Sequence, residues 1–71
     1  MNSSILRQIW NIVEQTQSTV LLRLSDMDLV KQLLSQLSNQ TKLSKEELNT
    51  VSLYLSSRTA LIRDLAAARS A

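Results

Sequence analysis

The acidic side chains are the first candidates for chemistry in this sequence, because paired carboxylates can act as general acids and bases or bind cations. They are Glu14, Asp26, Asp28, Glu46, Glu47 and Asp64. Four of them fall in the first turns of predicted helices, where they suit the positive end of the helix dipole. Glu46 and Glu47 are adjacent, so on a helix they point about 100° apart and do not converge on one substrate or ion. The carboxylates therefore indicate helix starts and no catalytic pair.

The composition supports neither a catalytic nucleophile nor a metal site. The chain has no histidine and no cysteine, so no serine has an imidazole base and no thiolate or imidazole can bind a metal. It also lacks glycine, which a phosphate-cradling loop needs. We therefore expect a protein that is not an enzyme, with no catalytic residue, no cofactor site and no metal site.

The arginines raise the alternative of nucleic-acid binding. They are Arg7, Arg23, Arg58, Arg63 and Arg69. On a helical wheel Arg58 and Arg63 point about 140° apart and form no single stripe, and the net charge is only +2. Residues 26–69 loosely follow a helix-turn-helix pattern, but the connection between the two helices is longer than the usual turn. The second helix, which would contact DNA, begins with Glu46 and Glu47, whose charge is unfavourable beside phosphate. A small nucleic-acid-associated regulator is therefore the alternative function, ranked below protein binding.

Two repeated motifs mark where helices must begin. They are LSDMDL at residues 24–29 and LSKEEL at residues 43–48. In each motif a serine, Ser25 or Ser44, occupies the position of an N-cap and is followed three residues later by an acid, which is the pattern of a capping box. The leucines that flank each motif can pack on each other as a hydrophobic staple. Helices are therefore predicted to begin at residues 26 and 45.

These starts divide the chain into three predicted helices, at residues 3–23, 26–38 and 45–69, within one domain of residues 1–71. Asn39 is the best available helix stop, because Asn tolerates the left-handed backbone conformation, and residues 39–42 form the loop. Hydrophobic residues make up 44% of the chain, as in globular proteins, and leucine and alanine favour helix. The predicted fold class is all-α, a helical bundle.

The apolar arcs on the first and last predicted helices are wide. Each covers about 160° of the wheel, whereas a surface helix of a monomer needs about 100°. The middle helix, about 20 Å long, is too short to cover the last one, about 37 Å long. We therefore predict that the bundle is completed by homodimerisation, with the first and last helices at the interface. The alternative is a three-helix monomer with a few exposed leucines.

The residues expected at such an interface are Trp10, Tyr54, Arg58, Leu61 and Leu65. Arg58 interrupts the apolar arc of the last helix, where it can grip a carboxylate of a partner. Alternatively, its stem covers leucines while its charge stays in water, and we favour this interpretation. Trp10 can be an interface anchor or an ordinary core residue, and core packing is favoured for a single tryptophan.

No run of about 18 uncharged apolar residues occurs, and the first residues lack the basic and apolar regions of a signal peptide. We therefore expect a cytoplasmic protein without a membrane-spanning helix.

Residues 43–47 and 54–66, LSKEE and YLSSRTALIRDLA, resemble the C-terminal half of small uncharacterised helical proteins from cyanobacteria. The resemblance covers about a third of the chain and includes no catalytic or ligand-binding motif. It implies a cytoplasmic protein and gives some weight to Arg58 as a functional residue. From the residues themselves we expect a non-enzymatic module that forms a homodimer and binds another protein through an exposed helical face.

Overall fold

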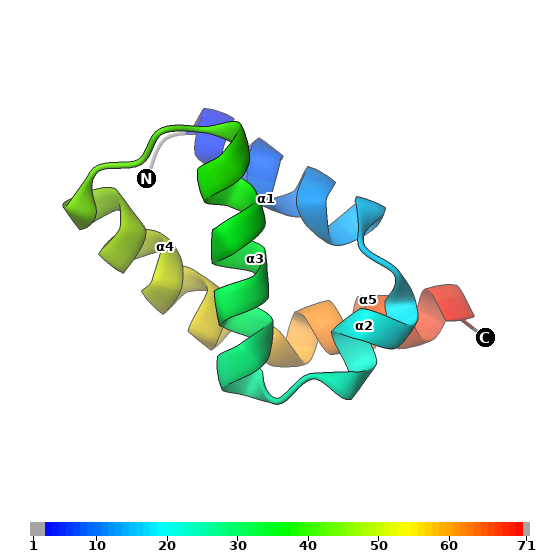
Figure 1. The fold of residues 1–71 in the computed structure, drawn as a ribbon. Coiled ribbons are helices and arrows are strands. Elements are labelled where there is room, and N and C mark those ends of the chain that lie inside the picture. The colour runs from blue at the N-terminus through cyan, green and yellow to red at the C-terminus, as the bar shows by residue number, and fades with distance from the viewer. Residues whose placement is uncertain (1–2, 71) are drawn as a thin grey trace.

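The structure is a computed structural model that describes residues 3–70, and this part of the chain is helical with short connections (Figure 1). The helices are α1 (Ser3–Gln15), α2 (Ser18–Arg23), α3 (Asp26–Gln40), α4 (Lys45–Ser57) and α5 (Thr59–Ser70). In Figure 1, α4 and α5 follow one another as a bent rod, and α2 lies over α5. The packed pairs include α2 with α5, α3 with α4, and α1 with α3. The predicted all-α class is confirmed.

The two predicted helix starts are also confirmed. The hydroxyl of Ser25 accepts a hydrogen bond from the backbone N–H of Asp28, at 3.2 Å. At the start of α4, the Ser44 hydroxyl accepts from the N–H of Glu47 at 3.1 Å, and the Glu47 carboxylate accepts from the N–H of Ser44 at 2.9 Å. Ser44 and Glu47 therefore form the full capping box, which satisfies two backbone donors near the helix start.

The prediction of one helix over residues 3–23 is wrong, because the chain breaks between α1 and α2. The hydroxyl and the N–H of Thr16 both donate to the carbonyl of Ile12, at 2.7 and 3.0 Å. Gln17 is extended, with φ −61° and ψ 139°, and α2 begins at the next residue. The terminal carbonyls of Glu14 and Thr16 accept hydrogen bonds from Arg69 of α5, at 2.7 and 3.1 Å. This arginine satisfies acceptors that a helix end leaves free.

The prediction of one helix over residues 45–69 is wrong for a similar reason. The Ser57 hydroxyl donates to the carbonyl of Tyr54 at 2.7 Å. The N–H of Arg58 instead bonds to the carbonyl of Leu55, three residues back, at 3.0 Å. Arg58 leaves the helical conformation, with φ −116° and ψ 8°. Serine and threonine hydroxyls that bond to the preceding turn are known to bend helices.

The middle helix runs to Gln40 and not to residue 38 as predicted. Asn39 does not act as a stop, and no residue within the described range 3–70 has a positive φ. The N–H of Thr41 still bonds to the carbonyl of Leu37 at 2.9 Å, which closes the last turn without a left-handed residue. The loop therefore begins two residues later than the sequence suggested.

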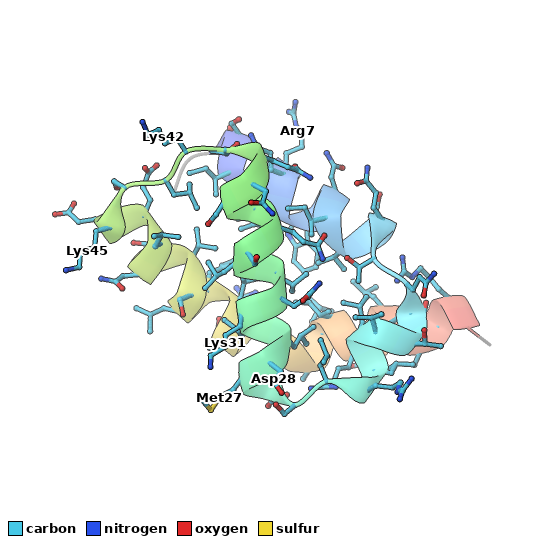
Figure 2. All side chains as sticks on the ribbon, viewed as in Figure 1. Arg7, Met27, Asp28, Lys31, Lys42 and Lys45 are labelled. Carbon is cyan, nitrogen blue, oxygen red and sulfur yellow. The ribbon has the colours of Figure 1, made fainter. Side chains whose placement is uncertain are left out.

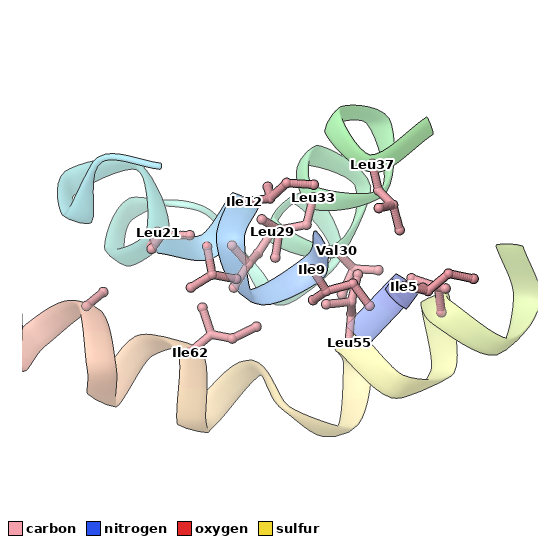
Figure 3. Packing of buried hydrophobic residues seen from close by; sticks show 13 residues of the cluster. Ile5, Ile9, Ile12, Leu21, Leu29, Val30, Leu33, Leu37, Leu55 and Ile62 are labelled. Atoms are coloured by element: carbon pink, nitrogen blue, oxygen red, sulfur yellow. The ribbon is translucent and has the colours of Figure 1, made fainter. Parts of the chain in front are cut away.

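The core lies between α3 and the bent rod of α4 and α5, and it is closed by α1 and α2 (Figure 3). Its buried apolar residues are Ile5, Ile9, Ile12, Val13, Leu21, Leu29, Val30, Leu33, Leu37, Val51, Leu55, Ile62 and Ala66. All of them lie within the three segments predicted to be helical. The break after α1 folds α2 onto α5, so one copy covers more of the last helix than the three-helix prediction allowed. Leu21 of α2 is fully buried as a result.

Candidate interaction surface

The two aromatic residues form one contact between α1 and α4. The indole Nε1 of Trp10 donates to the hydroxyl of Tyr54 at 3.2 Å. The ring centroids are 6.4 Å apart and the planes cross at 82°, an edge-to-face arrangement. Both side chains are half-buried and pack against the core. Trp10 is therefore partly a core residue, as favoured from the sequence, and partly a surface residue.

Arg58 lies on the surface, at the bend between α4 and α5. Its guanidinium carbon is 5.0 Å from the centre of the Tyr54 ring, and Nη1 donates to the Ser57 hydroxyl at 3.3 Å. The residue is exposed, so its charge stays in contact with water. A cation over an aromatic ring at an exposed site gains about 0.5–1 kcal/mol. The charged group therefore lies over an aromatic ring, whereas the sequence suggested a stem packed on leucines.

Leu61 and Leu65 lie one turn apart on α5, with 44% and 45% of their surface exposed. Leu65 lines a hollow of about 300 Å³ between α1 and α5, the α1–α5 hollow. Its lining residues are Trp10, Val13, Glu14, Leu65, Ala68 and Arg69. Trp10 thus contacts Tyr54 on one side and borders the hollow with Leu65 on the other. We call the five predicted interface residues, Trp10, Tyr54, Arg58, Leu61 and Leu65, the α5 face.

A second hollow lies on the other flank of α4, and sequence reasoning missed it. It measures about 420 Å³ and we call it the α3–α4 hollow. It is lined by Asp26, Met27, Val30, Lys31, Leu34, Ser52 and Ser56. Figure 2 shows Met27 and Lys31 on the same edge of α3, and Met27 is 71% exposed. The sequence feature that could have indicated this hollow is the pair of small residues Ser52 and Ser56, one turn apart on α4. They lie opposite the apolar side chains of Val30 and Leu34 on α3.

Arg63 is a structural residue that the sequence did not reveal. Its guanidinium donates to the carbonyls of Leu21, Leu22 and Leu24 at 3.2, 3.4 and 2.6 Å, and it pairs with Asp26 at 2.8 Å. Arg63 thus satisfies acceptors at the end of α2, as Arg69 does at the end of α1. Both were candidates for phosphate contacts, and both are engaged within the chain. No pattern in the neighbouring sequence predicts these contacts. The partners of Arg63 lie 37–42 positions away in the sequence, and those of Arg69 lie 53–55 positions away.

Within residues 3–70 no group of three acidic, histidine or cysteine residues is placed to hold a metal ion. No helix in this part of the chain is long and apolar enough to cross a bilayer. The resemblance of residues 43–66 to small cyanobacterial proteins stays a prediction. Comparison with family models, with curated proteins and with solved structures finds no match to this chain.

Proposed function

We propose that the protein is a non-enzymatic interaction module that acts as a helical homodimer and uses the α5 face to join its copies. The observation that carries the proposal is the exposure of Leu61 and Leu65 one turn apart on α5, where Leu65 borders the α1–α5 hollow with the half-buried Trp10. Single exposed leucines are ordinary on protein surfaces. Leucines grouped with an aromatic side chain around a hollow are typical of interaction sites.

The size of the chain supports the same proposal. A domain of this length gains only about 3–5 kcal/mol from one hydrophobic core. Covering the α5 face removes further apolar surface from water, at about 25 cal/mol for each Å². A second copy supplies an identical apolar face, and closed two-fold dimers are the commonest homo-oligomers.

Sedimentation equilibrium tests the dimer. We expect the wild-type protein to approach twice the 8.0 kDa of one chain at micromolar concentrations. Leu65→Glu introduces a charge at the centre of the α5 face and is expected to give the mass of one chain. Leu53→Glu is the matched control, because Leu53 is 74% exposed on α4 and lies outside the α5 face. A wild-type protein that sediments as one chain at all concentrations would contradict the proposal.

The binding of another protein is the second part of the proposal. The α3–α4 hollow remains accessible when copies join through the opposite flank of α4 and α5. Met27 is a flexible side chain that adapts to different apolar partners. Affinity purification from the native cell, followed by mass spectrometry, would identify a protein held there. Ser56→Arg fills the hollow, so a protein retained by wild type must be lost with this variant, while the dimer is kept.

A further inference from the structure

Two exposed charges of opposite sign, Arg58 and Glu14, lie near opposite ends of α5, and neither has an ion-pair partner within residues 3–70. Arg58 precedes the first turn of α5, and the only ion pair within residues 3–70 joins Arg63 and Asp26. Glu14 borders the α1–α5 hollow together with Ala68, near the other end of α5. Both Glu14 and Arg58 are exposed. The rise of a helix places residues 58 and 69 about 16 Å apart.

Arg69 lies near Glu14 but does not form an ion pair with its carboxylate. Its Nη1 and Nη2 donate to the backbone carbonyls of Glu14 and Thr16. These carbonyls form the negative end of the α1 dipole, which the guanidinium offsets. The carboxylate of Glu14 is therefore left without an ion-pair partner in the described chain.

We propose that the second copy packs with its α5 antiparallel to the first, so that Glu14 of each copy pairs with Arg58 of the other. This inference rests on the proposed homodimer. In an antiparallel two-fold arrangement Leu61 of one copy packs against Leu65 of the other, and the same register places Arg58 opposite Ala68, beside Glu14. A parallel arrangement instead places Arg58 against Arg58 and Glu14 against Glu14. Repulsion between like charges disfavours it.

The area that a stable dimer needs is a small part of the surface of one copy. A stable interface buries about 800 Å² on each partner, roughly a sixth of the 4727 Å² that one copy exposes. Leu61 and Leu65 supply the apolar centre of the proposed interface, and Glu14 and Arg58 lie at its rim. Charged pairs at a rim set the orientation of partners more than their affinity.

Charge reversal tests the pairing in the full chain. Glu14→Arg and Arg58→Glu each place like charges opposite one another twice per dimer, and we expect each to raise the dissociation constant about tenfold. Mixing the two variants restores two attractive pairs, so the mixture must dimerise about as tightly as wild type. The double variant E14R/R58E must also recover. Arg7→Glu is the control for Arg58→Glu, because it changes the net charge by the same amount from an exposed site outside the α5 face.

The outcomes separate this inference from the proposed function. A weaker dimer in both single variants, with recovery in their mixture and in the double variant, supports the antiparallel pairing. A dimer that neither reversal weakens, or that neither combination restores, overturns the pairing and leaves the homodimer in place. A wild-type chain that never dimerises overturns both. Circular dichroism of each variant confirms that the helices are retained.

Discussion

At the scale of single residues, the fold depends on two arginines that end helices in a chain without glycine. Glycine commonly ends a helix by adopting a left-handed backbone conformation, and this sequence has none. Arg63 and Arg69 of α5 instead donate to the free carbonyls of α2 and α1. A guanidinium group is suited to this role because it carries five donors in a rigid plane.

Replacement of Arg63 should therefore cost more than loss of its ion pair. Arg63→Gln is expected to lower the free energy of unfolding by about 2 kcal/mol, because it removes charge-assisted bonds to several carbonyls. Asp26→Asn is expected to cost less than about 1 kcal/mol, since the Asp26 side chain is 70% exposed. Urea denaturation measures both. Equal losses would show that the ion pair, and not the carbonyl contacts, stabilises this corner.

Ser44 provides a second residue-scale prediction. Ser44→Ala removes the acceptor for the Glu47 N–H and is expected to cost about 1 kcal/mol. Glu47→Ala should cost less, and the double variant should cost less than the sum, because the two side chains form one reciprocal cap. Chemical denaturation of the three variants gives the comparison. Strict additivity would contradict a shared capping box.

The caps at Ser25 and Ser44 could be predicted because the hydroxyl and its donor are three positions apart in the sequence. The caps supplied by Arg63 and Arg69 could not, because their acceptors lie on helices far away along the chain. On the helical wheel Arg63 and Arg69 lie about 120° apart, so they do not mark one functional side of α5. Only the folded arrangement reveals that they reach the ends of α2 and α1.

At the scale of elements, the two breaks decide how the helices pack. Neither break contains glycine or proline, so the usual sequence marks of a helix end are missing. A back-bonding hydroxyl alone is also insufficient, since Thr50 donates to the carbonyl of Glu46 within α4 without ending it. The break after α1 occurs where Arg69 also supplies donors. Local sequence therefore predicted the buried faces correctly and the continuity of the helices wrongly.

Proline substitution tests the break between α1 and α2 directly. Gln17 has φ −61°, which is close to the angle that proline imposes. Gln17→Pro is therefore expected to change the free energy of unfolding by less than about 1 kcal/mol. Asn11→Pro, at an exposed position inside α1, should cost about 3 kcal/mol or more. If both substitutions cost the same, residues 3–23 form one helix after all.

At the scale of the whole molecule, helical periodicity could place Leu61 and Leu65 on one side of the last helix, and their role in an interface stays a prediction. Trp10 and Tyr54 are 44 positions apart in the sequence, so their hydrogen bond could not be anticipated. The α3–α4 hollow was also missed, because it depends on how closely two helices approach. The extent of the exposed apolar surface was overestimated, because α2 folds back onto α5.

Dimerisation should make thermal stability depend on protein concentration. A tenfold rise in concentration stabilises a folded dimer by about 1.4 kcal/mol through mass action, which should raise the melting temperature by a few degrees. Circular dichroism measures the shift. Leu65→Glu should melt at the same temperature throughout, whereas Leu53→Glu should behave like wild type. A concentration-independent wild-type midpoint would count against the dimer.

Trp10 provides a direct optical signal for the same interface. It is the only tryptophan in the chain and it borders the α1–α5 hollow. When a second copy covers the α5 face, its fluorescence should shift to shorter wavelength as water is excluded. Dilution should reverse the shift over the concentration range in which the mass falls. An emission spectrum unaffected by dilution would place the contact away from Trp10.

The arginines of α5 also have a consequence for the order of events during synthesis. A ribosome adds about 5–20 residues each second and releases the N-terminal part first. Residues 3–23 therefore emerge before the guanidinium groups that end α1 and α2 exist. Until α5 has emerged, the hydrogen bonds that Arg63 and Arg69 donate to the ends of α2 and α1 cannot form, so these two helix ends are completed last.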